Sequence, residues 1–251
     1  MATVTARAPR RFFSATPFRA SVIWAALLIY LGIAQLCLWR FLDAFPLWVY
    51  PLGGGALLGL AIAVVRTIRV ADDSDIGPSL GTFLLCLLFA LLLFALGGEG
   101  RFFYSNIDWQ VRYAVIRDIA TQPWPFAYID GGAPLVLRAP IAMYFLPALG
   151  WKAWGPAAAD YLLLLQNSLL LATVLSLGAR LFDNGRQRAA ALLILTFFSG
   201  LDIVGQYFTG SVTEHRESWG ATQFSSAITQ AFWVPHHALP CWIRILAFLR
   251  W

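Results

Sequence analysis

The sequence predicts an all-α fold: a polytopic transmembrane helix bundle with a long external loop that contains juxtamembrane helices. The first reason is composition, because 59% of the 251 residues are hydrophobic and only 12% are charged, whereas soluble domains carry about 25% charged residues. The second is that several apolar runs carry no charge over the length that a bilayer core requires. The third is that arginines flank these runs and do not interrupt them.

Three segments, residues 22–39, 46–65 and 80–96, are apolar and uncharged throughout. A spanning helix needs about 20 predominantly apolar residues, so we expect each of the three to cross the membrane. They predict that the first hundred residues form a set of three transmembrane helices.

Two later segments are apolar but contain polar side chains. Residues 161–179 carry Gln166 and Asn167, and residues 189–204 carry Asp202 near one end. Amides in a spanning helix commonly form hydrogen bonds to neighbouring helices. We expect these segments to be the fourth and fifth spans.

The basic N-terminal tail sets the expected orientation. No small-residue cleavage site follows the first apolar run, which is typical of a signal anchor that is retained. Short cytoplasmic segments are rich in Lys and Arg, so the N-terminus is predicted to be cytoplasmic and the chain to be a multi-pass membrane protein. The basic residues on the same side are Arg7, Arg10, Arg11, Arg19, Arg66, Arg69, Arg180, Arg186 and Arg188.

Residues 135–149 are apolar, but the segment contains Arg138, Pro140 and Pro147. An Arg near the bilayer centre costs about 2.5 to 3.5 kcal/mol, and proline removes a helix hydrogen bond. A crossing here would also move the later arginines to the outer side. We therefore expect this segment to be re-entrant or to lie at the membrane interface.

These assignments divide the chain into five parts. They are a cytoplasmic basic tail (1–21), three transmembrane helices (22–98), an external loop with juxtamembrane or re-entrant helices (99–160), two transmembrane helices (161–206), and an external segment that ends in an apolar stub (207–251). The abrupt ending predicts that the chain is the N-terminal part of a longer protein.

The net charge of +5 does not predict nucleic-acid binding, because the arginines sit beside apolar runs and not on a polar segment. The expected partners are membrane lipids. A divalent metal is compatible with Glu214, His215, His236 and His237, but their spacing matches no metal signature. We therefore assign no metal ligands and no cofactor.

The external loop contains a predicted helix at residues 107–119. One face is apolar and is expected to face lipid or the spans; it is formed by Ile107, Val111, Ala114, Val115 and Ile119. The other face carries Asp108, Arg112, Arg117 and Asp118. A carboxylate beside arginines just outside a span is suited to meet a phosphate group and a hydroxyl acceptor.

The layout around residues 80–204 resembles the first external loop of GT-C glycosyltransferases. The resemblance rests on residues 106–113 (Asn-Ile-Asp-Trp-Gln-Val-Arg-Tyr), a Pro/Gly-containing stretch, and residues 139–147 (Ala-Pro-Ile-Ala-Met-Tyr-Phe-Leu-Pro). In that superfamily the loop carries an acidic catalytic residue and two juxtamembrane helices, which Asp108 and the segments 107–119 and 135–149 match. The family often has paired acids here, whereas this chain has Asp108 alone.

The resemblance implies inverting transfer of a sugar from a polyprenyl-phosphate donor on the external face. Asp108 would be the general base for the acceptor hydroxyl. The resemblance also implies that a group of arginines holds the donor phosphate: Arg101, Arg112, Arg117 and Arg138. His236 and His237 would line the acceptor pocket.

Other interpretations of the same residues stay open. Asp108 and Arg112 have the spacing of an ordinary i, i+4 surface pair, and the other arginines would then anchor in headgroups. Gln166, Asn167 and Asp202 would serve a transporter or channel. A noncatalytic membrane scaffold is the third alternative.

Overall fold

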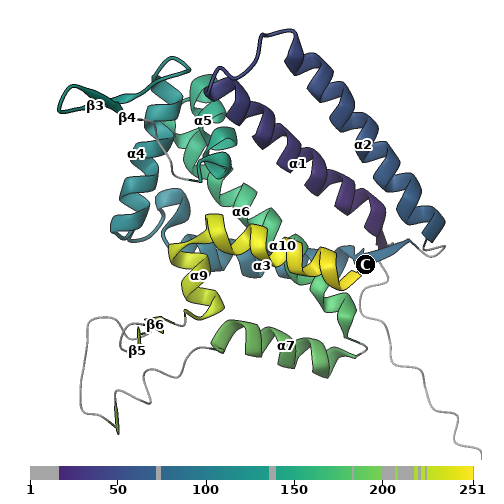
Figure 1. Ribbon diagram of the computed structural model, residues 1–251. Helices are drawn as coiled ribbons and strands as arrows, with labels where there is room; N and C mark the ends of the chain where they lie inside the picture. Colours follow the sequence, from purple (N-terminus) through teal and green to yellow (C-terminus); the bar gives the residue numbers. More distant parts are fainter. Residues whose placement is uncertain are drawn as a thin grey trace, which may run out of the picture.

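The computed structural model describes residues 17–71, 75–135, 140–182, 184–198, 207–208, 218–219, 222–223 and 225–250. This part of the chain is mostly helical (Figure 1). Its longest helices are α1 (Ala20–Phe41), α2 (Val49–Ala71), α3 (Leu80–Leu96) and α6 (Pro156–Gly178). The first of these packs against the second, and α3 packs along α6. These four helices contain most of the apolar runs that the sequence predicted as spans, at residues 22–39, 46–65, 80–96 and 161–179.

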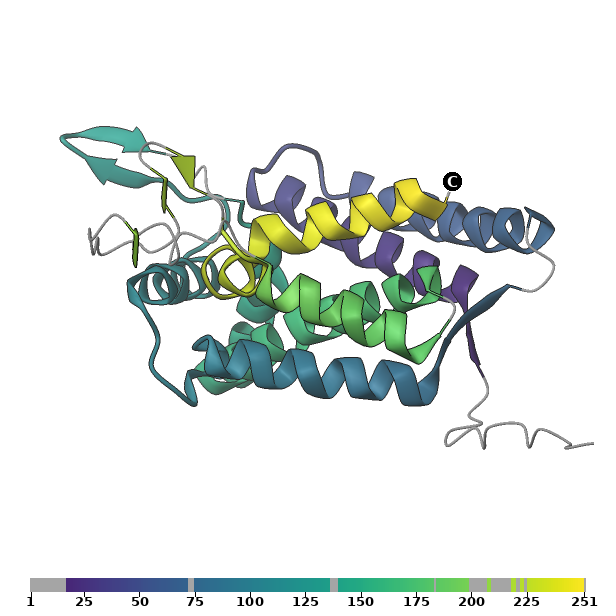
Figure 2. The ribbon, with the colours of Figure 1, turned by 90° about the horizontal axis from the view of Figure 1, so that it is seen from below.

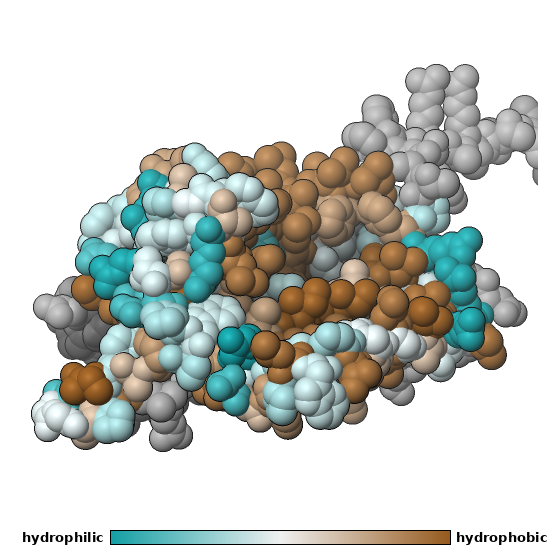
Figure 3. Space-filling model, turned by 90° about the horizontal axis from the view of Figure 1, so that it is seen from above, coloured by the Kyte–Doolittle hydropathy of each residue, from teal (hydrophilic) through white to brown (hydrophobic). Residues whose placement is uncertain are grey.

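Three described helices are long and apolar enough to cross a membrane: Ala20–Phe41, Val49–Val70 and Pro156–Leu181. Helix α3 is apolar but shorter, with 17 residues. Large hydrophobic side chains on these helices are exposed, including Leu58 at 57% and Leu85 at 62%. A broad hydrophobic area extends across one face, with hydrophilic residues gathered towards its two ends (Figure 3). This pattern suggests a membrane protein.

A small two-stranded sheet lies at the N-terminal end of α1. Strand β1 (Pro17–Arg19) pairs antiparallel with β2 (Ile76–Ser79). The N-cap of α1, Arg19, provides no side-chain cap. Asp75 takes this role from a distant part of the chain, because its Oδ1 accepts from the Ser21 amide at 2.8 Å and its Oδ2 from the Ser21 hydroxyl at 2.6 Å. The carboxylate therefore satisfies a helix-terminal donor that has no intrahelical partner.

Two shorter helices form the opposite end of the molecule. Helix α4 (Ile107–Thr121) lies across the end of α3 and does not extend it, as Figures 1 and 2 both show. Helix α5 (Ala142–Trp154) packs against α4 and α6. The chain turns from α5 into α6 at Gly155, whose φ of +88° favours glycine. A 3₁₀ turn η1 (Glu99–Arg101) links α3 to α4, and a hairpin of β3 (Tyr128–Asp130) and β4 (Ala133–Leu135) links α4 to α5.

The prediction of a helix at 107–119 is confirmed. Of the face expected to point towards lipid or the spans, Ile119 packs inside the protein and two residues are exposed. Ile107 and Val111 are 65% and 59% exposed. The face that packs against α5 and the end of α1 carries Trp109, Arg112, Tyr113, Ile116, Ile119 and Ala120. Aromatic side chains bury more area than aliphatic ones, and their polar atoms find partners: the Tyr113 hydroxyl donates to the Gly98 carbonyl at 3.1 Å.

The later part of the chain differs more from the prediction. Helix α7 (Gly185–Phe197) follows a 3₁₀ turn η2 (Ala179–Leu181) and ends where the backbone of Phe198 is extended. The predicted span 189–204 is therefore not one continuous helix, and residues 199–206 lie outside the described part. The remaining elements are β5 (Ser218–Trp219), β6 (Thr222–Gln223), α9 (Ala227–Trp233) and α10 (Pro235–Arg250).

The predicted apolar stub is the second half of α10, which packs along α6. Ile243 of this half is buried with Leu27 of α1 and Val174 of α6. Pro240, which directly precedes this half, lies inside the helix. The tertiary contact of α10 with α6 outweighs the loss of one backbone hydrogen bond at the proline.

The distant cap of α1 generates a stability prediction. Asp75→Asn should lower the free energy of unfolding by about 0.5 to 2 kcal/mol, the usual cost of a lost helix cap. Burial alone would raise the pKa of Asp75, but the hydrogen bonds from Ser21 and the charges of Arg69 and Arg19 lower it overall. The contribution should therefore be present above about pH 3.9 and be lost as pH falls through the lower folded-state pKa.

Thermal unfolding in detergent at several pH values measures this effect. Asp43→Asn is the matched control, because Asp43 is also at positive φ but is an exposed partner of Arg40. Asparagine tolerates that backbone conformation as aspartate does. Equal unfolding midpoints for the two variants would contradict the capping role.

Candidate functional site

A cluster of buried polar side chains lies where α4, α5 and α10 meet the middle of α6. Glu99 of η1 is fully buried, and its Oε1 accepts a hydrogen bond from Asn167 Nδ2 at 2.9 Å. Asn167 is at the midpoint of the 23-residue helix α6. The neighbouring Gln166 is also buried, and its amide donates to the Met143 carbonyl of α5 at 2.9 Å. Two adjacent amides of α6 therefore bind both η1 and α5.

The charged member of the cluster is Arg112 of α4, which is only 7% exposed. Its guanidinium lies over the Trp109 ring, 4.6 Å from the centroid, and close enough to the Tyr144 side chain of α5 for each group to affect the pKa of the other. Its Nη1 is buried and has no hydrogen-bond partner within the described residues. Because guanidinium pairs strongly with carboxylate and phosphate, this nitrogen is available for an anion.

Helices α9 and α10 cover this cluster. The Trp109 indole donates to the Phe232 carbonyl of α9 at 3.0 Å. A Cβ on Gly97 would lie 2.8 Å from the Phe232 ring, so this position accepts only glycine without movement of the ring. His236 of α10 lies close enough to Arg112 for the guanidinium charge to affect its pKa, and its Nδ1 is buried without a partner among the described residues.

The protonation states follow from burial. Burial raises the pKa of Glu99 well above its ordinary value, against the opposing effects of the Asn167 hydrogen bond and the Arg112 charge. The pKa of His236 falls to about 4, first because of burial and then because of Arg112 and His237. The pKa of Arg112 is lowered by burial, but Tyr144, Asp108 and Glu99 counteract this. At neutral pH the His236 imidazole beside Arg112 is therefore neutral, and burial favours the neutral form of Glu99.

The structure brings several of the predicted site residues together. Asp108 lies in the first turn of α4, is half-buried, and acts electrostatically on Arg112 one turn later. Arg112 is buried, so the pair is not an ordinary surface pair. His236 approaches Arg112 from α10, and the His237 ring is 4.3 Å from the His236 ring.

Other predicted residues lie apart from this group. Arg101 forms an ion pair with Asp160 at 3.2 Å and lies over the Tyr113 ring at 4.1 Å. Arg117 is exposed and pairs with Asp118 at 3.0 Å. Arg138 lies outside the described residues, as do Asp202, Glu214 and His215. Within the described part, no three His, Cys, Asp or Glu side chains come together as a metal site.

The sequence interpretation passed over Glu99 and gave Tyr144 no role. One signal was available for Glu99: it is the first charged residue after the uncharged run 80–96, and it stands between Gly98 and Gly100. Both glycines have positive φ values, +106° and +74°, and they turn the acid inward. A charge at this place is costly unless it is neutralised or paired.

Comparisons with protein-family models, with curated proteins and with solved structures found no match for this chain.

The buried Glu99 generates a prediction about pH. Since its folded-state pKa is raised, the group stabilises the fold fully below the ordinary pKa of about 4.3, and the stabilisation is lost as pH rises through the folded-state pKa. The parent protein should therefore unfold at lower temperature as pH is raised from about 5 to 8. Glu99→Gln should remove this contribution, because glutamine keeps the acceptor for Asn167 but does not titrate.

Thermal unfolding midpoints across this pH range measure the effect. Asp130→Asn, on the exposed β3–β4 hairpin, should keep the pH dependence of the parent. If Glu99→Gln retains the full pH dependence of the parent, the inference that burial raises the pKa of Glu99 is wrong.

Proposed function

We propose that this chain is a membrane glycosyltransferase of the GT-C type, or part of one, which transfers a sugar from a polyprenyl-phosphate donor to an acceptor on the external face of the bacterial inner membrane. In this proposal the chain is a polytopic helix bundle with a cytoplasmic N-terminus, and α4 and α5 are its juxtamembrane helices. The observation that carries the proposal is the buried, unpartnered Nη1 of Arg112 beside the carboxylate of Asp108.

The arrangement supports a division of roles. A lipid-linked phosphate would complete the hydrogen bonding of Arg112, whose guanidinium lies over Trp109 and near Tyr144. Asp108 is half-buried at the start of α4 and can meet an acceptor hydroxyl, which a general base must approach within hydrogen-bond distance. His236 and His237 lie on the helix that covers this region and would border the acceptor.

The fold also supports the external loop. Helix α4 crosses the end of α3 (Figure 2), and α5 packs beside it without being long enough to span. Two short helices between two longer apolar ones match the layout of the GT-C loop. Arg101 contributes in a different way, because its contacts with Asp160 and Tyr113 tie η1 to α6 and α4.

A transporter or channel is a second candidate, favoured by the meeting of Glu99 with Asn167 at the middle of α6. Buried ionisable groups inside a membrane bundle commonly mark ion or substrate pathways. In a glycosyltransferase Glu99→Gln should retain sugar transfer. In a proton-coupled transporter the same change should abolish uptake into liposomes.

Asp108 provides the direct test of chemistry. Asp108→Asn keeps the size of the side chain but removes its basicity, so turnover should fall by about 100- to 10,000-fold, the usual contribution of general acid–base catalysis. Membrane insertion and donor binding should be nearly unchanged. Transfer of labelled sugar from a polyprenyl phosphate, assayed in membranes, measures the rate.

Asp43→Asn should retain the parent's rate, because Asp43 is exposed in the loop after α1 and pairs with Arg40. A rate for Asp108→Asn within a few-fold of the parent would exclude Asp108 as the base. The search would then move to Asp118, Asp130 and Glu214. Arg112→Gln should instead weaken donor binding, with its thermal midpoint recorded to separate binding from folding.

Orientation has its own test. A reporter that is active only outside the cytoplasm should be active when fused after Gly132 and silent when fused after Asn184. Gly132 lies in the turn of the β3–β4 hairpin, and Asn184 caps α7. An active fusion at Asn184 would show that the segment 135–149 crosses the membrane, and the proposed loop would fail with it.

A further inference from the structure

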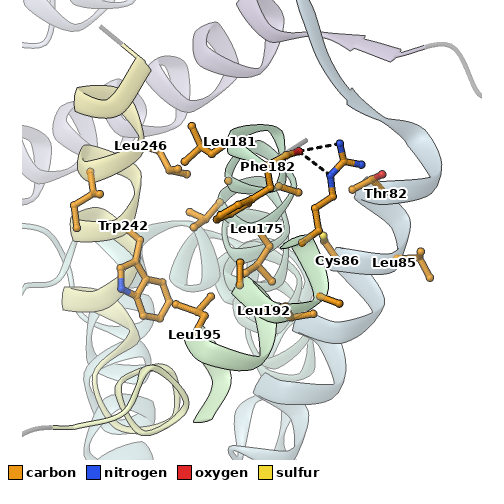
Figure 4. Close-up of a pocket in the computed structure, with 17 residues that line it drawn as sticks. Thr82, Leu85, Cys86, Leu175, Leu181, Phe182, Leu192, Leu195, Trp242 and Leu246 are labelled. Atoms are coloured by element: carbon orange, nitrogen blue, oxygen red, sulfur yellow. Dashed lines mark hydrogen bonds between the residues drawn. The ribbon is translucent and has the colours of Figure 1, made fainter. Parts of the chain in front are cut away.

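An apolar groove separates α7 from the packed helices α3, α6 and α10. Its volume is about 470 Å³, within the range of roughly 300 to 1,000 Å³ that is typical of small-molecule sites. Figure 4 shows its walls, with Leu85 from α3, Leu175 from α6, Leu192 and Leu195 from α7, and Trp242 and Leu246 from α10. Its lining is almost entirely apolar, so water would occupy it at a cost.

Helix α7 itself is incompletely packed. It contains no buried residue, and Leu192, which lines the groove, is 38% exposed. A helix of this composition normally buries one face against its neighbours. In this structure the groove lies where that contact would form, so an apolar molecule in the groove would complete the packing.

Of the described residues that line the groove, one is charged. Arg188 of α7 donates from Nε and Nη2 to the Phe182 carbonyl, each at 3.2 Å (Figure 4). These bonds use two of the five N–H donors of guanidinium and hold it in place. Arg180 and Arg186 are exposed nearby in the chain and add positive charge, while Asp183 lies outside the described residues. An apolar groove with a positioned guanidinium matches a molecule with an apolar tail and an anionic head.

We propose that this groove binds an anionic phospholipid, with one acyl chain between α7 and α10 and the phosphate on Arg188. The tail matches the apolar walls, and the phosphate matches the free donors of Arg188. Basic residues beside membrane helices attract anionic headgroups, and a phospholipid is present wherever these helices meet a bilayer. The site is built from other residues than the Arg112 cluster, and the inference does not depend on sugar transfer.

Native mass spectrometry of the purified chain in detergent tests this inference. The protein is incubated with phosphatidylglycerol or with phosphatidylcholine, and retained lipid is counted. The parent should retain phosphatidylglycerol preferentially. Arg188→Gln should weaken its retention by about tenfold or more, as expected for the loss of a charge-assisted hydrogen bond.

Two matched controls separate the site from general effects. Arg66→Gln removes the same charge from an exposed position on α2, outside the groove, and should retain the lipid as the parent does. Ala191→Phe fills the groove and should reduce retention, whereas Ala190→Phe changes the adjacent residue, which does not line it. The thermal unfolding midpoint of each of the four variants is measured, and lipid retention is compared only between variants whose midpoints are equal.

Four results would overturn the inference. Equal retention of the two lipids, or equal retention by Arg188→Gln and Arg66→Gln, would show that the headgroup is not bound by Arg188. Displacement of the lipid by inorganic phosphate alone would identify a free-anion site. If the chain forms a dimer that is disrupted by Ala191→Phe and is not dissociated by lipid, the groove is an interface between copies of the chain.

Discussion

The hydrogen bond between Glu99 and Asn167 is the constraint on which the α4–α5 end of the molecule depends. It joins η1, at the end of α3, to the middle of α6. The first half of α6 therefore extends beyond the end of α3, where it packs with α5. Burial favours the neutral form of the acid there. Its Oε1 accepts from Asn167, whereas its Oε2 has no partner among the described residues. The 3₁₀ turn η1, which positions Glu99, also directs the chain across the end of α3. As a result, Arg112 of α4 lies near His236 of α10.

The helices of the first half could be predicted from sequence because their signal is local. Apolar runs without charge lie within α1, α2, α3 and α6, and the helix at 107–119 was found within two residues of its end. The direction of its buried face could not be found in this way. Helix α4 has two apolar stripes, and the one with Trp109 and Tyr113 is buried because α9 and the end of α3 provide carbonyl partners for both.

The candidate site shows the same division between local and distant information. Arg112 and His236 were chosen for their residue type, and their proximity depends on α10, whose continuity through Pro240 the sequence did not suggest. The importance of Glu99 depends on Asn167, 68 positions away. Neither the Arg112–His236 contact nor the Glu99–Asn167 contact leaves a pattern in a single sequence. Taken alone, each of these residues is also compatible with a position at the membrane interface or at the edge of a helix.

The cap on α1 has a consequence for the order in which the protein assembles. Its acceptor, Asp75, lies 54 positions after Ser21, which it binds, so the first helix is synthesised and threaded well before its cap exists. Until α2 has followed, the amide of Ser21 must be satisfied by water or headgroups. The N-terminal hairpin of α1 and α2 is therefore completed as one unit, and an interruption of synthesis between the two helices would leave α1 without the carboxylate that caps it.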